Sequence, residues 1–203
     1  MTERARFHGR IAGLGTTSGV RVVVGWWDQS PWGVFADVML ADAEGRRVLL
    51  APTDEVAAFV SVTYRFDRVE VVPVAVTSAG TRVAVAAGDL ALGFTVGRRT
   101  TLGRALRVVP APLATSPSWC RVTDPVARRL LSGVRTRGSA GGGRTESYGA
   151  TDHHRVDTVH GTWRGSALGT LAPVRPDPRF GFGSTPASPS VTTLVTTVTG
   201  ALP

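Results

Sequence analysis

The chain has 203 residues, of which 42% are hydrophobic and 19% are charged, and its formal net charge at pH 7 is +8. This composition supports a buried core and excludes a wholly disordered chain, and no apolar run approaches the roughly 18 residues that a membrane-spanning helix needs. All 23 basic residues are arginine, so chemistry that depends on a lysine Schiff base or a P-loop lysine is excluded.

Short strand patterns separated by turn residues dominate the first half of the chain. Residues 6–15 and 20–27 flank the turn-like sequence TTSG and predict a hairpin. Residues 33–40 and 46–52 predict a second hairpin, in which Gly45 is the residue that can take a positive φ. Further strand patterns follow at 65–76, 81–88, 89–96 and 102–111.

Two short helices are predicted to interrupt the strands, at about 54–64 and about 125–132. Thr53 caps the first helix, which opens with two acidic residues that suit the positive end of its dipole. The second helix is expected to begin with Pro125 at its first position and to turn Val126 toward the core.

Strand patterns resume in the second half, at 145–150, 154–163, 166–174 and 190–200. The glycine-rich segment 138–144 predicts a flexible loop, and the proline-rich run 172–189 predicts an extended connection. Ten to twelve short strands of this spacing favour a mainly β fold: a single domain over 1–203, built as an antiparallel β-barrel or as packed sheets, with the two short helices.

The stretch SPWGVFADVML, from Ser30 to Leu40, resembles a hairpin of the acetoacetate decarboxylase-like proteins. In that family a Gly-Pro-Tyr-Asn-Glu type piece runs into an apolar strand, and Gly33 to Asp37 occupy those places here. The resemblance implies a strand-rich cone or barrel with an enclosed ligand pocket. It does not extend to the decarboxylase reaction, which in that family runs through a lysine.

The segment from Ser139 to Val156 carries the residues best suited to a site. Histidine can act as an acid, a base or a ligand near neutral pH, and a carboxylate can orient a neighbouring imidazole and raise its pKa. Two arginines that are two positions apart can grip one anion with fork geometry if the backbone is extended. The candidate ligand-binding residues are Arg135, Arg137, Tyr148, Asp152, His153, His154 and Trp32.

The favoured hypothesis is a small-molecule pocket, for binding or catalysis, that accepts an anionic ligand. A polar hairpin edge without function is the simpler interpretation of the His153–His154 stretch, because adjacent strand residues point to opposite faces. A structural or protein-interaction module is the alternative function. Nucleic-acid binding is a second alternative, because the segment from Arg98 to Arg144 holds ten arginines and one acid, a charge of +9, whereas the rest of the chain sums to −1.

The sequence indicates no cofactor, no metal site and no membrane partner, and nucleic acid is a less favoured partner than a small anion, because recognisable binding motifs are missing. The oligomeric state is not indicated. Residues 1–10 are polar and contain no apolar segment of a secretory signal, and Cys120 has no second cysteine to pair with, so we expect a cytoplasmic protein with a buried, structural Cys120.

Overall fold

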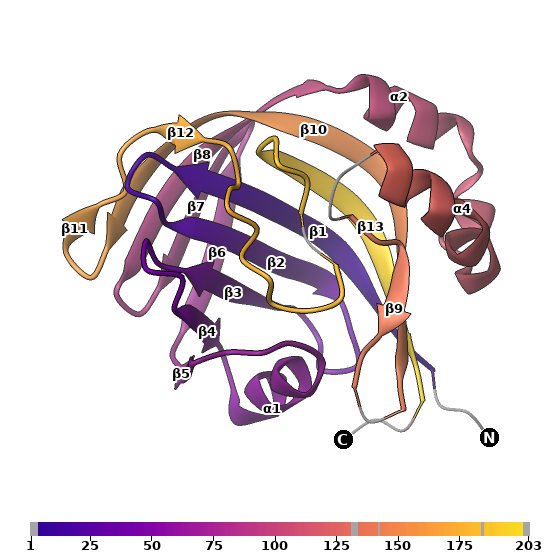
Figure 1. Cartoon of the computed structure of the whole chain (residues 1–203), viewed down its shortest axis with the longest axis horizontal. Coiled ribbons are helices and arrows are strands. Elements are labelled where there is room, and N and C mark those ends of the chain that lie inside the picture. The colour runs from indigo at the N-terminus through magenta and orange to yellow at the C-terminus, as the bar shows by residue number, and fades with distance from the viewer. Residues whose placement is uncertain (1–3, 131–133, 142, 184, 201–203) are drawn as a thin grey trace.

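The computed structural model describes residues 4–130, 134–141, 143–183 and 185–200, which form thirteen strands and four helices (Figure 1). The predicted mainly β class is therefore confirmed. The strands are β1 Arg4–Thr16, β2 Arg21–Gln29, β3 Phe35–Ala41, β4 Arg47–Ala51, β5 Arg68–Val71, β6 Val74–Ala79, β7 Arg82–Ala87, β8 Leu90–Arg99, β9 Arg137–Ser139, β10 Thr145–Trp163, β11 Ser166–Ala167, β12 Leu171–Ala172 and β13 Ser190–Thr199. The helices are α1 Asp54–Thr63, α2 Thr101–Val108, α3 Ala111–Ala114 and α4 Pro117–Leu130.

All strands belong to one strongly curved sheet that forms a half-barrel. The strand order is β5-β4-β3-β2-β1-β13-β10-β8-β7-β6, and β9, β11 and β12 pair at its sides. Neighbouring strands run antiparallel except β4 and β5, which are parallel because helix α1 connects them as a crossover. The sheet is therefore mixed, which corrects the expectation of a purely antiparallel one.

The strands β1 to β4 form a middle layer that is buried on both faces. Alternate residues such as Val24, Val38 and Leu50 face an aliphatic core, where they meet Leu92 and Phe94 of β8. This packing requires the β6–β8 part of the sheet to curl over that face of β1–β4. The aliphatic core thus fills the space that the curved sheet encloses on this side.

The opposite face of β1–β3 carries a second, more aromatic core. Helix α1 packs Phe59 and Val60 there, beside Phe7 and Trp27. The connection between β12 and β13, residues 173–183 and 185–189, crosses in front of the same face in Figure 1. Helix α1 and this connection therefore cover the aromatic face of the sheet.

The first predicted helix is confirmed and the second needs correction. Helix α1 begins after Thr53, whose hydroxyl accepts a hydrogen bond from the Val56 backbone N–H. Residues 125–130 of the helix predicted at 125–132 are the second half of α4, which begins at Pro117, so Pro125 lies inside a helix rather than at its first position. Residues 131 and 132 lie outside the described residues. Val126 is 55% exposed and does not face the core.

Helices α2 and α3 were not predicted, and the strand expected at 102–111 does not exist. Segment 101–108 is a helix capped by Thr100, and it packs across β10 through Gly103. A Cβ on Gly103 would lie 2.2 Å from the His153 carbonyl oxygen, so the close approach depends on glycine. None of the helices within the described part of the chain is long and apolar enough to span a membrane.

The two strands expected at 145–150 and 154–163 are one long strand, β10, with register shifts between 150 and 158. Of the predicted flexible loop at 138–144, residues 138 and 139 belong to β9, and residue 142 lies outside the described residues. The rest leads from β9 to β10, which pair as a hairpin, with Gly141 and Gly143 at positive φ. The Ala140 N–H donates to the Arg144 carbonyl oxygen, and the Arg144 N–H donates to the Gly141 carbonyl oxygen. The flexibility of this hairpin stays a prediction.

Candidate functional site

A cavity of about 50 Å³ lies between the aromatic face of the sheet and helix α1. Most of its wall is apolar, and five side chains bring polar atoms to it from β3, β10, β13 and the end of α1. The lining residues are Phe7, Ile11, Val23, Gly25, Trp27, Phe35, Asp37, Met39, Phe59, Val60, Tyr64, Glu146, Tyr148 and Thr196.

Asp37 reaches the cavity from the middle of an apolar strand. It pairs across the sheet with Gly25, and the Trp27 indole N–H donates to its Oδ1 at 3.1 Å. A Cβ on Gly25 would lie 2.8 Å from that oxygen and 3.1 Å from the indole nitrogen, so the missing side chain leaves room for the hydrogen bond. Asp37 is 5% exposed.

Glu146 and the two tyrosines of the chain form a polar cluster at another wall of the cavity. The Tyr64 hydroxyl donates to Glu146 Oε2 at 3.1 Å and is also hydrogen-bonded to the Tyr148 hydroxyl. Tyr64 is the C-cap residue of α1, and Glu146 and Tyr148 are alternate residues of β10, so both point to the same face of the sheet. Helix α1 therefore brings one phenol to the strand that supplies the carboxyl and the other phenol.

Burial changes the acidity of this cluster. It raises the pKa of Asp37 to about 6, against the opposing effect of the hydrogen bond from Trp27. It raises the pKa of Glu146 to about 7, against the hydrogen bonds from Tyr148 and Tyr64 and the charge of Arg144. The pKa values of both tyrosines are raised well above their usual value, first by burial and then by the charge of Glu146.

The positive charge of buried Arg144 acts on the pKa of Glu146, but the two side chains do not form an ion pair. Its guanidinium lies 5.2 Å from the centre of the Phe59 ring and donates to the Ala140 carbonyl oxygen at 3.1 Å. Arg144 does not line the cavity. The arrangement therefore presents two carboxyls that exchange protons near neutral pH inside a mostly apolar space, a combination typical of binding and acid–base sites.

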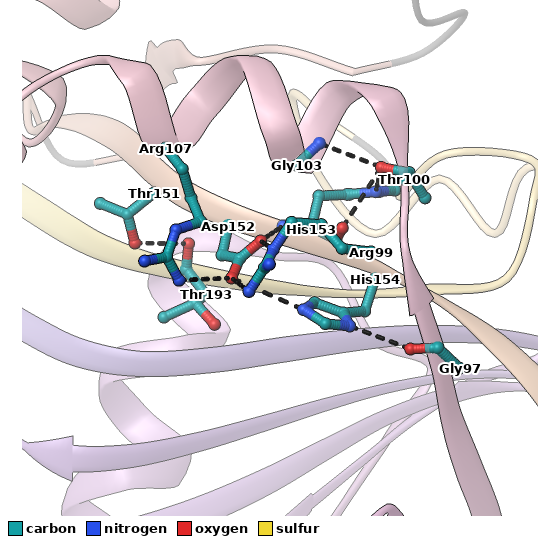
Figure 2. Close-up of polar contacts among 10 residues, drawn as sticks. All are labelled: Gly97, Arg99, Thr100, Gly103, Arg107, Thr151, Asp152, His153, His154 and Thr193. Carbon is teal, nitrogen blue, oxygen red and sulfur yellow. Dashed lines mark hydrogen bonds and ion pairs between the residues drawn. The ribbon is translucent and has the colours of Figure 1, made fainter.

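Three of the predicted site residues, Asp152, His153 and His154, lie in a different place, where α2 meets β10 (Figure 2). The Arg99 guanidinium donates to both oxygens of Asp152, at 2.8 and 2.9 Å. Arg107 lies 3.9 Å and His154 Nε2 lies 3.5 Å from Asp152 Oδ2. His153 Nδ1 is hydrogen-bonded to the Thr100 hydroxyl at 2.8 Å. These contacts fasten helix α2 to the strand.

Asp152 acts on the pKa of His153 in the predicted direction, but other effects outweigh it. The pKa of His153 is lowered, mainly by burial and then by the charge of His154, and the opposing effect of Asp152 is smaller. The hydrogen bonds from Arg99 are the main reason that the pKa of Asp152 itself is lowered. The main partner of the Asp152 carboxylate is thus the Arg99 guanidinium rather than an imidazole.

Of the predicted candidates, only Tyr148 lines the cavity. Trp32 packs in the same aromatic cluster, with its ring centre 4.7 Å from that of Phe59. Arg135 pairs with Asp124 of α4 at 3.2 Å, and Arg137 begins β9. The structure therefore does not bring the seven predicted residues together.

The sequence reasoning missed four polar residues of the cavity: Asp37, Tyr64, Glu146 and Thr196. Asp37 had been named only as part of the hairpin that resembles the decarboxylase-like proteins. A usable signal was present, because Asp37 is a lone acid within the apolar run FADVMLA. An acid at a position whose neighbours alternate into a core is a candidate for a functional site.

Metal binding and thiol chemistry are not indicated by the described residues. No three His, Cys, Asp or Glu side chains within them gather where they could hold a metal ion. Cys120 is buried, as predicted, and burial raises the pKa of its thiol to about 11.

No protein-family model matches the chain, and no curated protein matches it either. Among solved structures, acetoacetate decarboxylase from Legionella pneumophila is similar at 10% identity and a TM-score of 0.45, over 98% of this chain and 86% of that one. A structure assigned to AttH of Nitrosomonas europaea is similar at 13% identity and a TM-score of 0.32, over 98% of this chain and 52% of that one. The first of these structures is an acetoacetate decarboxylase, from the family whose hairpin residues 30–40 resemble.

Proposed function

We propose that this protein binds a small molecule in the cavity between the sheet and helix α1. The observation that supports the proposal is the convergence of two buried carboxyls and two phenols, from two walls, on an otherwise apolar cavity. Burying a polar group without a partner is costly, and a ligand that supplies hydrogen bonds there would offset that cost.

The ligand has to be small. A cavity needs about 10 to 15 Å³ to hold one water molecule, so this cavity of about 50 Å³ accepts roughly four non-hydrogen atoms. An apolar body would contact Phe7, Phe35 and Phe59, and a polar group would meet Asp37 or Glu146.

The sequence-based hypothesis of an anionic ligand fits this cavity less well than a neutral or cationic one. Its lining contains two acids and no arginine. An anion would enter only with both carboxyls protonated, since like charges in a space of low dielectric constant repel strongly.

The chain offers a specific reporter for the test. It contains two methionines, Met1 and Met39, and Met39 lines the cavity. With methyl-¹³C-methionine labelling, NMR of a panel of neutral, cationic and anionic fragments of up to about six heavy atoms should shift the Met39 signal and leave Met1 in place.

A pair of matched variants separates cavity binding from surface binding. Val23→Phe fills the cavity and should abolish the Met39 shift, whereas Val122→Phe makes the same change at a residue that is 66% exposed on α4 and should preserve it. The proposal is wrong if no fragment shifts Met39, or if fragments shift it equally in Val23→Phe.

A further inference from the structure

Among the described residues, neither buried acid of the cavity forms an ion pair with a cation. Asp37 and Glu146 are each 5% exposed, and their hydrogen bonds come from neutral groups, Trp27 for Asp37, and Tyr64 and Tyr148 for Glu146. Buried carboxylates are normally compensated by a positive charge. A cation inside the cavity would provide that compensation.

The remaining wall of the cavity suits a cation as well. It contains six aromatic side chains, and the negatively polarised face of an aromatic ring attracts ammonium groups, more strongly when water is excluded. The six residues are Phe7, Trp27, Phe35, Phe59, Tyr64 and Tyr148.

Thr196 adds an independent observation. Its side chain lines the cavity and is 3% exposed, and its hydroxyl oxygen has no hydrogen-bond partner among the described residues. An ammonium ion that retains an N–H can donate to this oxygen, whereas a quaternary ammonium ion cannot.

We propose, on the premise that the cavity binds a small molecule, that its ligand is a small protonated amine held between the aromatic walls, the carboxyls of Asp37 and Glu146 and the hydroxyl of Thr196. The ammonium N–H groups donate to the carboxylate oxygens and to the hydroxyl, and the alkyl groups contact the rings. No covalent step is involved.

Amine binding is coupled to the protonation of the cavity. The charged or titratable groups that act on the two carboxyls are Tyr64 at the end of α1, Tyr148 on β10 and Arg144 before β10, and the carboxyls also act on each other. Arg144 alone carries a positive charge, and the hydrogen bond to Ala140 and the contact with Phe59 hold it outside the cavity lining. Because a carboxylate binds an ammonium ion better than a carboxylic acid does, affinity rises as the pH rises from about 5.5 to 8.

The test compares small probes of different charge. Trimethylammonium is the cation, with about four heavy atoms, tert-butanol is a neutral analogue with the same three methyl groups, and acetate is the anion. Each is titrated against the Met39 methyl signal at pH 5.5 and pH 8. With four heavy atoms the best attainable Kd is on the order of 40 µM, so millimolar titrations suffice. We expect trimethylammonium to bind at least about ten-fold more tightly than tert-butanol at pH 8, and the preference to shrink at pH 5.5.

Three variants test the residues. Asp37→Asn and Glu146→Gln keep the shape of the side chain and should each weaken trimethylammonium binding at least about five-fold while leaving tert-butanol unaffected. Asp157→Asn removes an acid that pairs with Arg155 on the surface of the same strand as Glu146, and it should change neither affinity. If one of the cavity variants fails to fold, the other carries the test.

The outcomes separate this inference from the proposed function. Equal binding of trimethylammonium and tert-butanol at both pH values overturns the amine assignment and leaves the small-molecule site intact. Tighter binding of acetate overturns it in favour of an anionic ligand. If none of the three probes and no fragment of the wider panel shifts Met39, the small-molecule site itself is wrong.

Discussion

Replacing Glu146 with glutamine should remove much of the pH dependence of this protein's stability. The folded protein holds a proton on Glu146 up to a pKa of about 7, whereas the ordinary value is 4.5. Between these values the folded state binds more protons than the unfolded chain does, so stability falls as the pH rises. Glutamine is neutral throughout and removes this contribution.

The size of the effect follows from the two pKa values. A shift of one pKa unit corresponds to about 1.4 kcal/mol, so Glu146 lowers stability by about 3 kcal/mol at high pH, and most of this, on the order of 2 to 3 kcal/mol, is lost between pH 5 and pH 8. For a chain of this length, 1 kcal/mol changes Tm by about 2 to 4 °C. The difference in Tm between Glu146→Gln and wild type should therefore grow by roughly 5 to 10 °C from pH 5 to pH 8.

Thermal denaturation followed by circular dichroism at both pH values measures this difference. Glu44→Gln serves as the control, because Glu44 lies at the surface beside Arg46, and this variant should follow the wild type at both pH values. A Tm difference between Glu146→Gln and wild type that stays constant from pH 5 to pH 8 would show that Glu146 ionises normally, and the electrostatic argument for the cavity would fail with it.

Three further outcomes can be checked on the same protein. Tyr64 and Tyr148 are the only tyrosines, so the absorbance at 295 nm should not rise near pH 10 while the protein is folded; a normal phenol titration would contradict their raised pKa values. Cys120 should resist a thiol reagent at pH 8 until the chain unfolds, and rapid labelling of folded protein would refute its raised pKa. Gly103→Ala should lower Tm by several degrees, although alanine favours helices, because its Cβ would meet the His153 carbonyl oxygen; a higher Tm would show that α2 can move away from β10.

The sequence was a good guide where local pattern decides structure. The strand patterns up to residue 96 were correct except at 65–76, where one expected strand is two, β5 and β6, and Thr53 marked the start of α1 correctly. Segment 102–111 misled the prediction, because its apolar residues are compatible with a strand as well as with a helix. The contact of Gly103 with β10 is a tertiary interaction across about 50 residues, and no local pattern contains it.

The candidate site was harder to predict for the same reason. Residue type pointed to His153 and Asp152, which are conspicuous in a strand, but their partners Thr100 and Arg99 fasten a helix to the sheet. The cavity cluster joins Tyr64 to Glu146 across 82 positions. Such a pairing depends on how the whole sheet curves, which is not visible in the spacing of residues along the chain.

The position of β13 has a consequence for how the chain folds. It is the last of the described strands, yet it lies in the interior of the sheet and pairs with β1 on one side and β10 on the other. Its pairs with β1 join residues 177 positions apart, Gly13 and Ser190, up to 195 apart, Arg4 and Thr199. Contacts this distant in sequence make folding slow.

During synthesis at about 5 to 20 residues per second, roughly 10 to 40 s pass between the synthesis of β1 and that of its partner strand β13. Until then β1 and β10 both expose unpaired backbone N–H and C=O groups, to which strands of other nascent chains can pair. The interval before residues 190–199 dock is therefore the stage at which this protein is most exposed to aggregation.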